Sequence, residues 1–190
     1  MRAYKLRALI FLALCCDLGL FAKRAVNPFA NLITDALHIP GGIGTSFSLM
    51  FLVVAASMLP GMFCGSIMGA VQSVLALGFG MVGSMGALSP IGYIVPGLVV
   101  DLTLRLARRA SLSREEGILL ANTAAAPCAA LTANLIVFRL SGIPLLLYLC
   151  VASASGAFCG LLAARLAARV APVIGAELQR DNPQKEEYPL

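Results

Sequence analysis

Four charged side chains lie within or beside long apolar segments of the sequence: Asp17, Asp35, Asp101 and Arg139. A charge inside a membrane is costly, so each of these residues is expected to have a partner or a function. Asp101 and Arg105 are four positions apart and could form an ion pair on one helix face. Asp35 has Asn31 four positions before it and His38 three positions after it, so a short helix would align the three polar groups. These groups are predicted either to contact a solute or to order a loop through hydrogen bonds.

A second set of candidate binding residues combines aromatic and methionine side chains with a few polar groups. It comprises Phe79, Met81, Ser84, Met85, Tyr93, Asn134, Arg139 and Tyr148. Small-molecule sites are mostly apolar and use a small number of oriented polar groups for specificity. A flat aromatic vitamin would suit this set, and His38 with the nearby methionines would also suit haem as the solute. Both sets together form the predicted substrate-binding site.

The sequence gives little support for catalysis. The glycine-rich run 78–86 lacks the Gly-Lys-Ser/Thr of a phosphate-binding loop, so no ATP site is expected. The single histidine has no acid–base partners in the pattern of an active site. The six cysteines fall mostly in apolar runs without Cys-x-x-Cys spacing, so neither a disulfide nor a metal site is expected. We therefore predict a protein that is not an enzyme and has no catalytic residues, metal or resident cofactor.

Long uncharged runs must position the candidate residues. The chain is 59% hydrophobic and only 12% charged, a balance typical of proteins that reside in a bilayer. No Asp, Glu, Lys or Arg occurs between Asp35 and Asp101, a run roughly three times the ~20 residues that one spanning helix needs. Two further runs, 117–138 and 140–164, can each span once. Because the runs are continuously apolar, the predicted fold class is an all-α integral membrane protein with six transmembrane helices.

The expected helices are separated by two long connections. Helices are expected at 4–22, 43–59, 89–106, 114–139 and 144–169, and a further helix lies between the turn at 60–61 and the glycine-rich run. The connections are 23–42, where Pro28 would begin a short separate helix, and 78–90. We expect one membrane domain, 1–174, followed by a polar cytoplasmic tail, 175–190.

Lysine and arginine are divided unevenly between the two predicted sides of the membrane. Eleven fall on the side of the N-terminus, and three, Lys23, Arg24 and Arg139, fall on the other side. The positive-inside rule therefore predicts that both termini are cytoplasmic and that connections 23–42 and 78–90 lie outside. The basic residues are interpreted as topology signals, so the net charge of +5 does not indicate a nucleic-acid partner.

Small residues recur at four-residue spacing in two of the expected helices. They are Gly61, Gly65 and Gly69 in the third helix and Ala152, Gly156, Gly160, Ala164 and Ala168 in the sixth. Small residues on one face let membrane helices approach closely. The glycine face of the third helix is predicted either to pack within the chain or to dock a partner membrane subunit.

The whole arrangement resembles the substrate-binding S components of energy-coupling factor (ECF) transporters. The resemblance covers about residues 4–170 and includes segments 27–42 (NPFANLITDALHIPGG) and 45–52 (TSFSLMFL). It implies that a vitamin- or cofactor-like solute is captured at the outer face of a prokaryotic cell membrane. It also implies inward delivery when the chain is coupled to a transmembrane coupling subunit and ATPase subunits. Such proteins often dock through Ala-x-x-x-Ala in the first helix, and Ala8 and Ala13 are the imperfect counterparts here.

Two other functions fit parts of the sequence. A membrane structural or assembly subunit without a solute site would use the small-residue faces to hold a complex together. A membrane enzyme is the third reading. The long outer connection with Asn31, Asp35 and His38 favours solute binding over a scaffold.

The charge distribution makes a direct prediction about topology. A reporter fused after Leu190 should report a cytoplasmic position, because eleven basic residues against three set that orientation. Paired alkaline phosphatase and fluorescent-protein fusions measure this. A fusion that is active only on the outer side would contradict the predicted orientation.

Overall fold

The computed structural model describes residues 6–36, 43–59, 63–81 and 83–180, with side chains except at 6–9, 30, 31, 33–36, 83, 84 and 173–180. Within these ranges the structure has six α-helices, which confirms the all-α prediction. They are α1 (Leu6–Ala36), α2 (Ile43–Met58), α3 (Cys64–Gly78), α4 (Ser89–Arg109), α5 (Arg114–Ala133) and α6 (Ile143–Arg180). A 3-10 helix, η1 (Gly83–Leu88), precedes α4, and a π-helical turn, η2 (Asn134–Phe138), follows α5.

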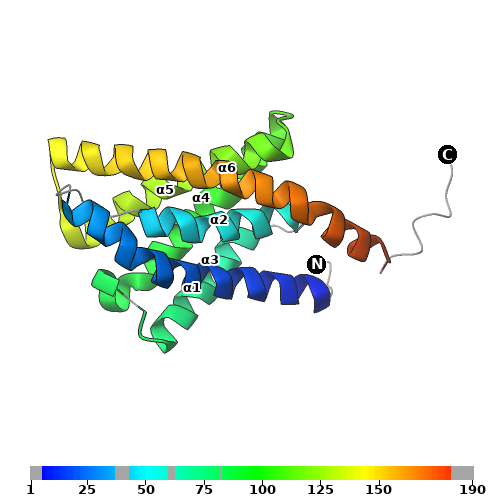
Figure 1. Cartoon of the computed structure of the whole chain (residues 1–190), viewed down its shortest axis with the longest axis horizontal. Helices are drawn as coiled ribbons and strands as arrows, with labels where there is room; N and C mark the ends of the chain where they lie inside the picture. Colours follow the sequence, from blue (N-terminus) through cyan, green and yellow to red (C-terminus); the bar gives the residue numbers. More distant parts are fainter. Residues whose placement is uncertain (1–5, 37–42, 60–62, 82, 181–190) are drawn as a thin grey trace.

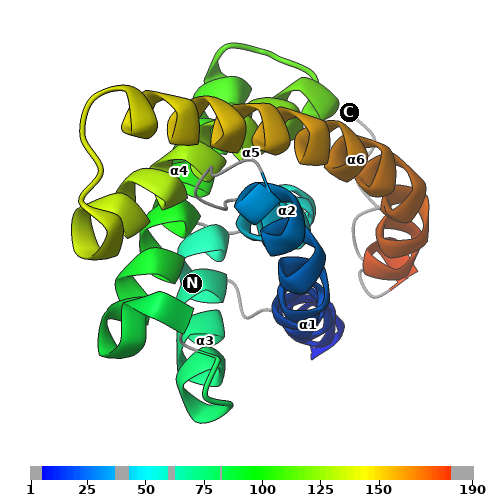
Figure 2. The same cartoon turned by 60° about the vertical axis from the view of Figure 1, so that its left-hand side comes forward.

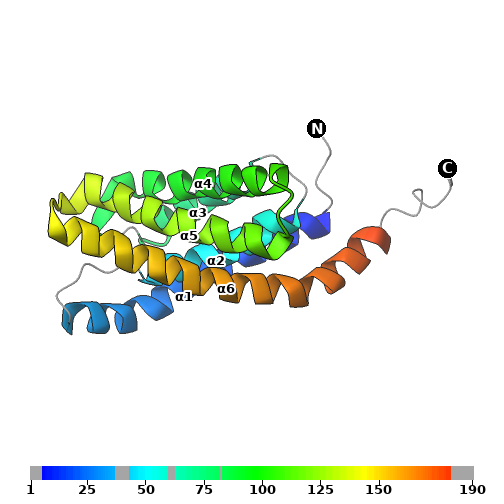
Figure 3. The same cartoon turned by 90° about the horizontal axis from the view of Figure 1, so that it is seen from above.

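The helices form an elongated bundle built around α2. The start of α1 and the end of α6 lie at one end of the bundle, and the turn between α5 and α6 lies at the other (Figures 1 and 3). Figure 2 shows α2 between α1, α6 and the α3–α4–α5 side of the bundle, and α2 contacts all five other helices. The remaining main contacts follow chain order, with α3 on α4, α4 on α5 and α5 on α6.

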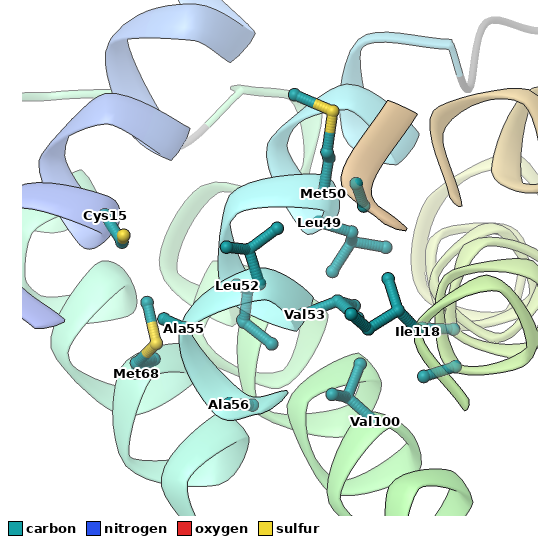
Figure 4. Packing of buried hydrophobic residues seen from close by; sticks show 14 of the residues in the cluster. Cys15, Leu49, Met50, Leu52, Val53, Ala55, Ala56, Met68, Val100 and Ile118 are labelled. Carbon is teal, nitrogen blue, oxygen red and sulfur yellow. The ribbon is translucent and has the colours of Figure 1, made fainter. Parts of the chain in front are cut away.

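The sequence of α2 explains its central position. The helix has no charged residue, and its buried positions include Leu49 and Met50 as well as the continuous run from Leu52 to Ala56. A helix that is apolar on every side is stable only when every side is covered. Figure 4 shows these side chains meeting Met68 of α3 and Ile118 of α5.

Three helical stretches are long and apolar enough to cross a membrane: Met85–Arg109, Arg114–Phe138 and Ile143–Pro172. The apolar helices α2 and α3 are shorter, with 16 and 15 residues. The predicted count of six spans and the cytoplasmic position of both termini stay predictions.

Two predicted boundaries are wrong. The first helix does not end near position 22, because α1 continues through Pro28 to Ala36. A proline inside a helix removes one backbone hydrogen bond, whereas an open loop at membrane depth would leave many polar groups unsatisfied. The sixth helix does not end near position 169, because α6 continues to Arg180. The division into a membrane domain, 1–174, and a polar tail, 175–190, stays a prediction.

The glycines of α3 bring its backbone against α4. A Cβ on Gly65 would lie 2.8 Å from the Gly97 carbonyl oxygen, and a Cβ on Gly69 would lie 2.5 Å from that of Tyr93. The reciprocal substitution at Gly97 would place a Cβ 2.5 Å from the Gly65 oxygen. The structure therefore assigns Gly65 and Gly69 to packing within the chain instead of to a free docking face, because α4 already occupies that face. Gly61 lies outside the described residues.

Asp101 binds the start of α3 and does not pair with Arg105. Its Oδ1 accepts a hydrogen bond from Gly65 N at 2.8 Å, and its Oδ2 accepts from Ser66 N at 2.8 Å and Ser66 Oγ at 2.6 Å. A carboxylate in this position satisfies free amide groups and complements the positive end of the helix. The Arg105 guanidinium lies instead over the Phe63 ring, 4.4 Å from its centroid. The predicted ion pair is corrected to a helix cap formed by a residue 36 positions away in sequence.

Gly69→Ala should destabilise the protein, because its new methyl group would meet the backbone of α4. Overpacking of this kind costs about 1–3 kcal/mol, so the thermal unfolding midpoint in detergent should fall. Gly78→Ala is the matched control in the same helix, since nothing lies within 4 Å of a Cβ there. Equal midpoints for the two variants would contradict the close packing of α3 on α4.

Candidate functional site

Lys23 of α1 is in contact with Tyr93 of α4. The Lys23 ammonium is 3.5 Å from the Tyr93 hydroxyl oxygen and 4.7 Å from the centroid of its ring. The geometry combines a long hydrogen bond with a cation–π contact. The lysine side chain is partly buried within the bundle. The sequence predicts Lys23 only as a topology signal, although a charged residue within a long membrane helix is also a candidate for function.

Further aromatic and sulfur-containing side chains belong to α1, to the turn after α3 and to η1. Phe21 of α1 and Phe79, which follows α3, lie with ring centroids 6.5 Å apart and are 55% and 60% exposed. Met85 of η1 lies against Gly92, since its Sδ would be 2.6 Å from a Cβ at that glycine. We call Phe21, Lys23, Phe79, Met85 and Tyr93 the Lys23 cluster. Three of its members, Phe79, Met85 and Tyr93, were predicted site residues, and Met81 ends the turn after α3 with its N–H bonded to the Ala76 oxygen at 2.7 Å.

Asn134 and Arg139 order the turn that joins α5 to α6. The Asn134 side-chain oxygen accepts from Leu140 N at 2.7 Å, and its amide nitrogen donates to the Leu140 oxygen at 3.2 Å. Arg139 has a left-handed backbone, with φ of 50°, and an exposed side chain. Both polar atoms of the Asn134 side chain are engaged by the turn. These hydrogen bonds order the turn, and solute contact by Asn134 and Arg139 stays a prediction.

Tyr148 is a packing residue at the same end of the bundle. It is only 2% exposed, and its ring makes an edge contact with Phe138 at a centroid distance of 5.9 Å. Since η1 contacts η2, this group lies next to the part of the Lys23 cluster carried by η1. The structure thus brings residues of the predicted connection 78–90 and of the α5–α6 turn together at one end of the helix bundle.

Most of the other predicted residues lie outside the set of described side chains. Asn31 and Asp35 belong to α1, and Ser84 belongs to η1, but their side chains are outside the described set. His38 lies outside the described residues. Ala8 belongs to α1 without a described side chain, and Ala13 is exposed on the same helix. Solute contact and docking at these positions stay predictions.

Several buried polar side chains inside the bundle connect helices. Gln72 of α3 donates to the Cys16 oxygen of α1 at 3.2 Å, and Asn122 of α5 donates to the Gly156 oxygen of α6 at 2.8 Å. The hydroxyls of Ser46 and Ser155 are 2.8 Å apart across α2 and α6. Hydrogen bonds of this kind hold membrane helices together where no hydrophobic driving force exists between them. The spacing of residues within one helix does not predict these hydrogen-bond partners, because the partners lie on other helices.

A cavity of about 470 Å³ lies at the opposite end of α4 from Tyr93. Its walls come from the end of α2, the end of α4 and the start of α5, and Arg108, Arg114 and Ser113 contribute polar groups. This is the end that the charge distribution predicts to be cytoplasmic. Ser113 also begins α5 through a reciprocal cap, accepting from Glu116 N at 3.2 Å and donating its own N–H to the Glu116 carboxylate at 2.8 Å.

Comparisons with known proteins support the fold. No family model matches the chain, and no curated protein sequence matches it. Among solved structures, the chain is similar to a crystal structure of an S-component of an ECF transporter. The TM-score is 0.69 and the identity is 17%, and the match covers 99% of this chain and 100% of the other. The chain therefore has the fold of an ECF S component, as the sequence resemblance predicted, and three of its helical stretches are long and apolar enough to cross a membrane.

Asn134→Ala should loosen the α5–α6 turn, because it removes two hydrogen bonds that the Leu140 backbone makes. The free energy of unfolding should fall by about 1–3 kcal/mol, and hydrogen exchange should accelerate at 139–142. Ser141→Ala, an exposed position in the same turn, is the control and should change neither measurement. Unchanged exchange in Asn134→Ala would show that the turn does not depend on this side chain.

Proposed function

We propose that the chain is the substrate-binding membrane subunit of an ECF-type importer. The observation that carries this proposal is the S-component fold over the full length of both chains. It takes up a vitamin- or cofactor-like small molecule at the outer face and delivers it inward. Its partners are an ECF transmembrane coupling subunit and ATPase subunits, and Ala8 and Ala13 of α1 are the proposed docking positions.

The proposed solute site lies at the end of the bundle where α1, α3, η1 and α4 meet. The Lys23 cluster supports this position because it combines exposed aromatic area with two oriented polar groups, Lys23 and Tyr93. Asn31, Asp35 and His38 would enter from α1 and the segment after it. The turn at 139–142, ordered by Asn134, closes the same end of the bundle.

The proposed energy source is a partner ATPase. The run 78–86 has no phosphate-binding lysine, and it forms the end of α3 and most of η1. The face of α3 that carries Gly65 and Gly69 is occupied by α4. We therefore place docking of the coupling subunit on α1, where a surface is free for it. Exposed apolar residues of α1, among them Leu14 and Leu18, flank Ala13.

Native mass spectrometry of the detergent-purified chain should detect a co-purifying small molecule, which can then be identified and titrated. Phe79→Ala should weaken binding of that molecule by about fivefold to thirtyfold, because burying part of a phenylalanine side chain contributes about 1–2 kcal/mol. Phe158→Ala is the matched control, since Phe158 is 65% exposed on α6 away from the cluster. Its affinity should equal that of the unmodified chain.

Two results would count against the proposal. Absence of any bound molecule, together with no thermal stabilisation by metabolite extracts, would favour the alternative of a structural or assembly subunit without a solute site. Equal affinity of Phe79→Ala and Phe158→Ala would move the site away from the Lys23 cluster.

A further inference from the structure

Lys23 carries a positive charge inside the bundle without a carboxylate to neutralise it. Its one hydrogen bond in the described part of the chain goes to the Tyr93 hydroxyl, at the long distance of 3.5 Å. An ammonium group has three N–H donors, so this contact leaves donor capacity free. A tyrosine ring attracts a cation, but it does not cancel the charge. An ionised group in an apolar setting therefore needs a further partner.

The acidic residues near Lys23 cannot supply that partner. Asp17 is exposed and lies six positions earlier on α1, about 9 Å along the axis and on the far side of the helix. Asp35 lies twelve positions later, about 18 Å along the same helix. Asp101 lies eight positions beyond Tyr93, about 12 Å along α4, and both its oxygens accept hydrogen bonds from the start of α3.

The neighbours of Lys23 define what else a partner must contain. Tyr93 places an aromatic ring against the ammonium, and Met85 lies beside the turn of α4 that carries Tyr93. An apolar or aromatic body would pack against these two side chains, while an acidic group would reach the ammonium. Ion pairing with a lysine is geometrically permissive, since its charge is compact and its donors rotate.

We infer that the solute is an organic anion, whose carboxylate or phosphate pairs with Lys23 while its apolar part packs beside Tyr93 and Met85. This inference rests on the proposed function and adds the chemical class of the solute. Tyr93 acts as a positioning residue, because its ring and hydroxyl hold the ammonium in place. A cationic solute is excluded from this position by repulsion from Lys23.

Arg24 provides a matched control for Lys23. It is the next residue on the same helix, it carries the same charge, and its side chain is exposed. Neighbouring positions on a helix point about 100° apart, so Arg24 projects from a different face of α1. An effect of general charge on the protein would appear in both substitutions, whereas pairing with a bound anion would appear only at Lys23.

The test uses a small-molecule extract of the cells from which the full chain is purified, separated on an anion exchanger into a retained fraction and a flow-through fraction. Each fraction is added to the purified chain in lipid nanodiscs, and the thermal unfolding midpoint is measured. The retained fraction should raise the midpoint of the unmodified chain and of Arg24→Met. The shift should disappear in Lys23→Met and be partly restored in Lys23→Arg, which keeps the charge. Bound molecules are then identified by mass spectrometry and titrated, with at least a tenfold loss of affinity expected in Lys23→Met.

The outcomes separate this inference from the proposed function. Stabilisation by the flow-through fraction alone, or equal stabilisation of Lys23→Met and the unmodified chain, would overturn the anionic solute and leave solute binding intact. Absence of stabilisation by either fraction would overturn solute binding itself. If Lys23→Met fails to fold, Lys23→Gln and the comparison between Lys23→Arg and Arg24→Met decide the question by the same measurements.

Discussion

The close packing of α3 on α4 is the contact on which the proposed site depends. Gly65, Gly69 and Gly97 remove the side chains that would separate the two helices, so the backbones touch at two levels. Asp101 fixes the start of α3 through three hydrogen bonds. Because Gly69 abuts the backbone of Tyr93, a shift of α3 would displace the aromatic ring that faces Lys23. Stability and the geometry of the Lys23 cluster are therefore coupled through one interface.

Polar groups within the bundle divide into two kinds. Gln72 and Asn122 donate their amide N–H groups to backbone carbonyls of neighbouring helices, and Asp101 accepts hydrogen bonds from backbone amides. Such bonds satisfy buried groups and fix how the helices sit against one another. Lys23 and Arg105 differ, because each cation lies over an aromatic ring, that of Tyr93 or Phe63, and neither pairs with a carboxylate in the described part of the chain. Of these two cations, Lys23 is the one in contact with a predicted site residue, Tyr93.

The sequence predicted the helices well and the long-range contacts poorly, for a physical reason. Apolar runs longer than a membrane is thick leave a helix as the only way to satisfy the backbone, so the all-α fold followed from composition. The length of α1 was missed because Pro28 was taken as the start of a new helix, although one proline removes only one hydrogen bond. Asp101 was assigned to Arg105 because that residue is close in sequence. Its true partners lie 35 and 36 positions away, and the partner of Lys23 lies 70 positions away.

The short length of α3 explains why the site residues lie beside irregular backbone. With 15 residues, α3 is about 22 Å long, less than the ~30 Å hydrocarbon core of a bilayer. The described chain that follows, 79–81 and 83–88, must then lie partly at membrane depth if the start of α3 is near the opposite surface. Non-helical backbone persists there only where protein covers it or where it lines a cavity. The contact of η1 with η2 covers one side of this segment, and Met85 lies against Gly92, the residue before Tyr93. A helix that stops short of the surface thus leaves irregular backbone where the proposed solute site lies.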